Sequence, residues 1–96
     1  MEAFRKAVAL DPTRTAFRAR LATRLWENDQ YMQAISEWQT IASQEPGNVD
    51  THLALARAYL KVGDRVRAVG EYDRVLTLAP GQAEAREFVT KGKAGR

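Results

Sequence analysis

The sequence predicts an all-α protein in which helical hairpins stack on one another to form a solenoid. Pro12, Pro46 and Pro80 stand 34 residues apart and have similar neighbours. Between them, apolar residues recur every three or four positions, which is the spacing of one face of an α-helix. Short polar turns separate these segments, so consecutive helices are expected to run antiparallel. One period therefore holds one hairpin of two helices.

An alignment of residues 15–48 with residues 49–82 shows which positions recur. The identical pairs are Leu21/Leu55, Ala22/Ala56, Ala34/Ala68, Glu37/Glu71, Pro46/Pro80 and Gly47/Gly81. The similar pairs are Ile35/Val69, Trp38/Tyr72 and Ile41/Val75. Most of these are apolar or small residues at helical spacing, as expected for packing positions. Because a pair of short helices cannot bury its apolar stripes alone, each hairpin is expected to pack on the next one.

The order of the elements follows from this register. We expect a second helix of an incomplete unit, then two complete hairpins, then a first helix without its partner. These parts are residues 1–14, 15–48, 49–82 and 83–96 of a single domain with about six helices. The turns are expected at residues 27–30, 45–48, 62–64 and 79–82.

Three residues in the turns have the side chains that helix ends prefer. Gly63 can adopt the left-handed backbone conformation that commonly follows the last turn of a helix. Asn48 and Asp64 each precede a predicted helix, where a short polar side chain accepts a hydrogen bond from an otherwise unpaired backbone amide. The turns thus agree with the helices predicted from the apolar spacing.

The composition narrows the class of protein. With 96 residues, 45% hydrophobic and 28% charged, the chain has enough apolar residues for a modest core but not for a deep pocket. The formal charge of +3 is too small to indicate nucleic-acid binding by itself, and Cys is absent, which excludes disulfides and thiolate metal sites. The sequence contains neither a predicted membrane span nor a targeting segment, so we expect no membrane insertion.

The repeated positions match the tetratricopeptide pattern, which is W-x2-L-G-x2-Y in the first helix, A-x3-F in the second helix and a closing Pro. Its Leu, Gly, Tyr, Ala, Phe and Pro slots hold Leu55, Ala56, Tyr59, Ala68, Tyr72 and Pro80 in one unit, and Leu21, Ala22, Leu25, Ala34, Trp38 and Pro46 in the other. The chain therefore resembles the tetratricopeptide repeat family over nearly its whole length. Arg18 and His52 replace the Trp, so packing at that edge is expected to differ.

The residues give no indication of catalysis. His52 is the only histidine, and it has neither a cysteine nor a suitably placed serine with which to form a catalytic or metal site. The turn glycines do not form a phosphate-binding loop. Glu84 and Glu87 lie near the start of a predicted helix, where acidic side chains stabilise the helix N-terminus; this role is favoured over acid-base catalysis. We therefore predict a protein that is not an enzyme and that binds neither a cofactor nor a metal.

The resemblance implies that the first helix of each unit lines a concave groove that binds a peptide or protein partner. The residues expected there lie on the helix face beside the packing stripe: Ala16, Ala19, Thr23, Trp26, Glu27, Asp50, Leu53, Arg57, Leu60, Lys61, Glu84, Glu87 and Lys91. Trp26 is either a binding hot spot or a space-filler between adjacent first helices. Arg57, Lys61 and Lys91, with Thr23, are candidates to bind a carboxylate or the backbone of an extended or helical partner segment.

Other functions remain open at this stage. The Lys and Asn pairs by which some family members hold a terminal carboxylate are not present in the corresponding slots. Arg14, Arg18, Arg20 and Arg24 could bind nucleic acid, but they form two i,i+4 pairs on different faces and lack interleaved aromatic residues, which favours a solvated face. The chain could also be a spacer within a longer array, or could form homo-oligomers through uncapped ends.

Overall fold

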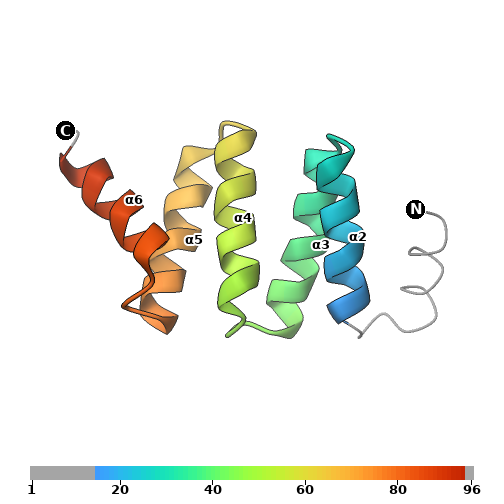
Figure 1. Ribbon diagram of the computed structural model, residues 1–96, viewed down its shortest axis with the longest axis horizontal. Coiled ribbons are helices and arrows are strands. Elements are labelled where there is room, and N and C mark those ends of the chain that lie inside the picture. Colours follow the sequence, from blue (N-terminus) through green and yellow to red (C-terminus); the bar gives the residue numbers. More distant parts are fainter. Residues whose placement is uncertain (1–14, 95–96) are drawn as a thin grey trace. The chain divides into compact units, whose positions relative to one another are not determined.

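The computed structural model describes residues 15–94, and in this range the chain forms helices and turns without a β-strand. The helices are α2 (Thr15–Glu27), α3 (Tyr31–Gln44), α4 (Val49–Lys61), α5 (Arg65–Leu78) and α6 (Ala83–Ala94) (Figure 1). The prediction of an all-α helical-hairpin fold is thus confirmed. The helix expected within residues 1–14 lies outside the described residues.

The first helices begin at Thr15, Val49 and Ala83, and the second helices begin at Tyr31 and Arg65. Equivalent starts are therefore 34 residues apart, as the proline spacing predicts. The chain divides into two compact units, Met1–Pro46 and Gly47–Arg96, which we call unit 1 and unit 2. In unit 1, α2 and α3 form an antiparallel hairpin, and in unit 2, α4 and α5 do the same and α6 packs on α5 (Figure 1).

The core of unit 1 lies between α2 and α3. One cluster in it is formed by Leu21, Leu25 and Ala34, each at most 2% exposed, with partly buried aromatic rings packed around them. The rings belong to Phe17, Trp26 and Trp38. Burying a leucine side chain contributes about 1.5–3 kcal/mol, so this small cluster is a main source of the hairpin's stability.

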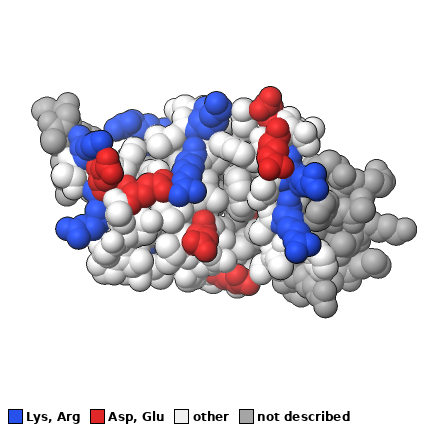
Figure 2. Space-filling view, in the orientation of Figure 1, with Lys and Arg blue, Asp and Glu red and all other residues white. Residues whose placement is uncertain are grey.

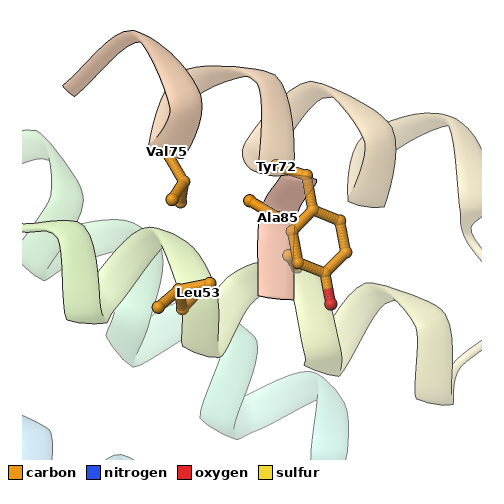
Figure 3. Packing of buried hydrophobic residues seen from close by; sticks show 5 residues of the cluster. Leu53, Tyr72, Val75 and Ala85 are labelled. Atoms are coloured by element: carbon orange, nitrogen blue, oxygen red, sulfur yellow. The ribbon is translucent and has the colours of Figure 1, made fainter. Parts of the chain in front are cut away.

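The core of unit 2 includes residues from three helices. Leu53, Tyr72, Val75 and Ala85 lie around a common interior (Figure 3), and Ala56 completes the cluster. Partly buried apolar residues pack against it: Val49, Leu60, Leu76, Phe88 and Val89. Because Ala85 is fully buried, the first turn of α6 belongs to this core.

The predicted caps are present. The Oδ1 atom of Asn48 accepts a hydrogen bond from the backbone amide of Thr51, and Oδ1 of Asp64 accepts one from the amide of Arg67, each at 3.1 Å. Gly63 has a φ of 85°, so it adopts the expected left-handed conformation. The equivalent position in unit 1 is Asp29, whose φ of 62° is also left-handed. This second left-handed residue was not predicted, because Asp adopts the conformation less often than Gly and so does not mark it clearly in a sequence.

The left-handed turn gives a stability prediction for Gly63. The replacement Gly63→Ala places a Cβ atom in a conformation that costs an L-residue about 1–2 kcal/mol, and we expect the free energy of unfolding to fall by about that amount. Urea denaturation followed by circular dichroism measures it. Gly81→Ala is the matched control, since Gly81 lies in a turn without a left-handed φ and has open space around it. An equal loss in both variants would contradict this explanation.

The two residues that replace Trp in the family pattern form equivalent interhelical pairs. Arg18 Nη1 lies 2.7 Å from Glu37 Oε1, and His52 Nδ1 lies 2.7 Å from Glu71 Oε1. Both pairs join the first helix of a hairpin to its second helix. The Arg18 and His52 side chains are only 13% and 3% exposed. The expected difference in packing therefore consists of a polar contact in place of an aromatic one.

Removing one partner of such a pair is expected to be costly because the other remains half-buried. We expect Glu37→Ala to lower the free energy of unfolding by about 2–3 kcal/mol, since the Arg18 guanidinium loses its carboxylate while remaining largely shielded from water. Glu27→Ala is the control, because it removes an exposed acid from the same unit. It should change the free energy of unfolding by less than about 0.5 kcal/mol. Similar values for both variants in urea denaturation would show that the pair contributes little.

A candidate partner-binding surface on the first helices

The predicted site residues of unit 1 differ in their surroundings. Thr23 and Glu27 are exposed on α2, as a binding surface requires. Trp26 is half-buried, and its ring lies 4.7 Å from the ring of Tyr31 and 5.9 Å from that of Trp38, measured between centroids. Trp26 thus packs within its own hairpin, against the second helix. This contact was not among the two roles considered from the sequence.

An open hollow of about 540 Å³ lies over the same helix. Its described lining is Ala19, Arg20, Thr23, Arg24 and Glu27. Two arginines one turn apart are thus exposed beside two of the predicted site residues. Arg18, in contrast, points into the hairpin and pairs with Glu37. The arginines of α2 therefore lie on different faces, as their spacing predicts.

In unit 2, most of the predicted residues of α4 are accessible. Asp50, Arg57 and Lys61 are exposed, and Leu60 is half-buried against the core. Leu53 is an exception, because its side chain is 6% exposed and belongs to the core around Ala85. It shares this core with Tyr72 and Val75 of α5 as well as with Ala85 of α6. The sequence could place Leu53 on a helix face but could not show that a neighbouring helix covers it.

A network of hydrogen bonds connects the three helices of unit 2. Arg57 Nε on α4 donates to both carboxylate oxygens of Glu84 on α6, at 3.1 and 2.9 Å, and Nη2 also donates to Oε1. The hydroxyl of Tyr72 on α5 donates to Oε2 of the same carboxylate at 2.9 Å. Glu84 therefore accepts hydrogen bonds from two different helices. We call these three residues the Arg57–Glu84–Tyr72 network.

The network changes the protonation behaviour of its members. The hydrogen bonds from Arg57 lower the pKa of Glu84; burial opposes this effect and the Tyr72 hydroxyl adds to it. The same pair raises the pKa of Arg57. Burial first, and then the hydrogen bond to Glu84, raise the pKa of Tyr72 to about 12. At neutral pH the network thus consists of a guanidinium, a carboxylate and a neutral phenol.

From the sequence, Glu84 and Glu87 are both expected to stabilise a helix N-terminus, and the Arg57–Glu84–Tyr72 network is not predicted. One signal was present, because Tyr72 brings a hydroxyl to a slot that is Phe in the family pattern. The geometry that joins the network's residues depends on how α6 packs, which the repeat period alone does not specify.

The other predicted residues of α6 are Glu87 and Lys91. They form an exposed ion pair at 2.7 Å, one helical turn apart. The hydrogen bond between them lowers the pKa of Glu87 and raises that of Lys91. Exposed pairs of this kind contribute little to stability because water screens them. Lys91 therefore provides an accessible charge rather than a structural contact.

The surface charge is mixed in sign. Figure 2 shows acidic and basic side chains beside one another on the viewed face rather than in separate blocks. Within residues 15–94, no group of three or more His, Cys, Asp or Glu side chains could hold a metal ion. In that same part of the chain, no helix combines the length and apolar character that crossing a membrane requires.

Comparison with known proteins decides the family. The model of the tetratricopeptide repeat matches residues 25–92, which is more than half of the chain. The chain belongs to the tetratricopeptide repeat family. Members of this family are generally interaction modules without catalytic activity. No curated protein sequence matches the chain.

Several solved tetratricopeptide structures have the same fold. A crystal structure of MamA matches with a TM-score of 0.83 at 24% identity and covers 88% of this chain and 49% of that one. YrrB, described as having an unusual peptide-binding site, matches with a TM-score of 0.81 at 21% identity, over 91% and 45%. The first tetratricopeptide domain of Spaghetti (RPAP3), bound to the HSP90 peptide SRMEEVD, matches with a TM-score of 0.84 at 18% identity, over 98% and 75%.

The TM-scores show a shared fold, and at these identities the matches show the fold alone. The chain spans about half the length of MamA and YrrB. The match therefore does not show that this chain binds the partners of those longer proteins.

The lowered pKa of Glu84 gives a prediction about acid stability. The pKa of Glu84 is lower in the folded chain than its ordinary value of 4.5, so the ionised carboxylate stabilises the folded state. This contribution is fully present above about pH 4.5 and is lost as the pH falls through the pKa of Glu84 in the folded chain. We expect Glu84→Gln to be less stable than the wild type at about pH 7 and to approach it at about pH 3. Urea midpoints across this range measure the difference.

The control for this experiment is Glu87→Gln, which removes an exposed acid from the same helix. We expect its urea midpoint to differ little from that of the wild type at either pH, because water screens the ion pair between Glu87 and Lys91. A gap between the wild type and Glu84→Gln that stays constant from about pH 7 to pH 3 would contradict the assignment.

Proposed function

We propose that this chain is an interaction module that binds a segment of a partner protein on the exposed face of its first helices. The main contact is the surface of α4, where Arg57 and Lys61 are exposed and Leu60 lies beside them. The partner is a peptide or protein segment with acidic and apolar side chains. Thr23, Trp26 and Glu27 on α2, and Glu87 and Lys91 on α6, are the further candidates.

The observation that carries this proposal is the position of Arg57. Its side chain is 57% exposed, and three hydrogen bonds to Glu84 hold it in one orientation on the surface of α4. An ordered cation beside an apolar side chain loses little conformational entropy when it binds a partner. Arginines in such positions are frequent hot spots of protein interfaces. The peptide-binding descriptions of YrrB and of the Spaghetti domain support the same type of function.

The test begins with a partner purified after retention on the immobilised wild-type chain. We expect the double variant Arg57→Ala with Lys61→Ala to raise the Kd for that partner by about tenfold or more, as is typical when central charged contacts are removed. Isothermal titration calorimetry measures the change. Arg74→Ala is the matched control, since Arg74 is an exposed cation on the second helix α5.

An unchanged affinity of every retained partner for the double variant would refute the proposed surface. A loss of affinity that is equal in Arg74→Ala would instead indicate a nonspecific electrostatic contribution. Trp26→Ala is unsuitable for this test, because Trp26 packs against two rings of its own hairpin and its removal alters the fold of unit 1.

A further inference from the structure

We propose that Arg57 anchors a side-chain carboxylate of the partner segment, and that Glu84 and Tyr72 are positioning residues that orient its guanidinium group. This inference rests on the proposed function and specifies the chemistry of its central contact. It assigns a role in recognition to two residues that, judged by their contacts alone, serve the packing of α6.

The hydrogen bonds of Arg57 leave part of its guanidinium available. An arginine side chain has five N–H donors in a planar arrangement. Those of Nε and Nη2 bond to Glu84, which is the hydrogen-bond partner of Arg57 within residues 15–94. The donors of Nη1 and the second donor of Nη2 remain, on a side chain that is 57% exposed. This remaining edge matches a carboxylate, which can accept two parallel hydrogen bonds from it.

The carboxylate of Glu84 is held in place more firmly than an ordinary surface group. The buried hydroxyl of Tyr72 donates to it, and Ala85, the next residue of α6, is fully buried. One turn later, the ring of Phe88 stacks on that of Tyr72 with 4.4 Å between centroids. The guanidinium of Arg65 lies 5.2 Å from the centroid of the Phe88 ring. Polar and apolar contacts together fix Glu84, and Glu84 in turn fixes Arg57.

The opposite role for Glu84 is that of a competitor, which would occupy Arg57 until a partner displaces it. The four hydrogen bonds that Arg57 and Tyr72 donate to this carboxylate favour the positioning role. Displacing Glu84 would break all of them and leave the Tyr72 hydroxyl buried without its acceptor. Lys61 lies one turn beyond Arg57 on the same helix and adds positive charge for a second carboxylate. The two roles predict changes of opposite sign, which makes them separable by experiment.

The surface around Arg57 indicates where the carboxylate lies in the partner. Accessible residues lie on both sides of Arg57 along α4: Asp50 and the half-buried Ala54 precede it, beside the buried Leu53, and Leu60 and Lys61 follow it. A segment lying along this helix continues past Arg57 on both sides. The carboxylate that reaches the guanidinium is therefore that of an aspartate or glutamate side chain within the segment, next to an apolar residue that contacts Leu60.

The test uses the full chain and a small probe, the acetylated and amidated tripeptide Leu-Glu-Leu. Binding is followed in nitrogen-15 NMR spectra through the Nε–H signal of Arg57. We expect this signal to shift on titration, and we expect the matched Leu-Gln-Leu tripeptide to bind at least about fivefold more weakly, because it lacks the charge of the carboxylate. Arg57→Ala should remove the difference between the two tripeptides.

Two variants test the positioning role without changing the net charge. Tyr72→Phe removes only the hydroxyl, which is neutral at pH 7 because its pKa is about 12. Glu84→Asp keeps the charge but shortens the side chain, so the carboxylate withdraws from Arg57. Each is expected to weaken binding of Leu-Glu-Leu by about two- to fivefold, in line with the loss of one charge-assisted hydrogen bond that orders Arg57. Glu87→Asp, on the exposed face of the same helix, is the control and should leave binding unchanged.

Each outcome decides the inference. Tighter binding to Tyr72→Phe and Glu84→Asp would make Glu84 a competitor, and unchanged binding would remove its positioning role. Equal affinity for the two tripeptides, or stronger binding of an acetylated Leu-Leu dipeptide with a free terminal carboxylate, would refute the side-chain anchor. If the Arg57→Ala, Lys61→Ala variant loses partner affinity while Tyr72→Phe and Glu84→Asp retain it, only this inference fails. If the double variant also retains its affinity, the proposed function fails as well.

Discussion

The close approach of two helices at buried alanines is the constraint on which each hairpin depends. Ala22 and Ala34 in unit 1, and Ala56 and Ala68 in unit 2, are completely buried. A methyl side chain lets helix backbones approach closely, and larger leucine, isoleucine or tyrosine side chains then pack around the contact. The four residues form two repeat positions, Ala22/Ala56 and Ala34/Ala68, and each position holds alanine again after 34 residues. A larger side chain at any of them would overfill the interface.

The features of the fold that depend on local periodicity could be predicted from the sequence. The helix starts at Thr15, Val49 and Ala83, and the caps at Asn48 and Asp64, follow from apolar spacing and residue type. Such features need information only from within one turn or one hairpin. The left-handed conformation of Asp29 was not predicted, because it depends on the geometry of the turn and not on the residue type alone.

The candidate site was less predictable because it depends on contacts between helices. The helix face predicted for Arg57, Lys61 and Leu53 is the same, yet Arg57 and Lys61 are exposed whereas Leu53 lies in the core. These expectations come from the same rule of helix periodicity. The outcomes differ because Leu53 joins the core formed with α5 and α6, whereas Arg57 and Lys61 stay at the surface. The role of Glu84 depends on the same packing. The Trp slots show a related effect, since Arg18 and His52 find acidic partners on the facing helix.

The packing of α6 links the stability of unit 2 to the properties of its surface. Ala85 and Phe88 attach the helix to the core through apolar contacts, while Glu84 attaches it through polar ones that end at Arg57. A change that loosens α6 is therefore expected to release the guanidinium as well. This coupling explains why charge-conserving substitutions are the appropriate way to study the surface. They separate the orientation of Arg57 from the charge that surrounds it, whereas truncation of a packed residue would alter both the surface and the core beneath it.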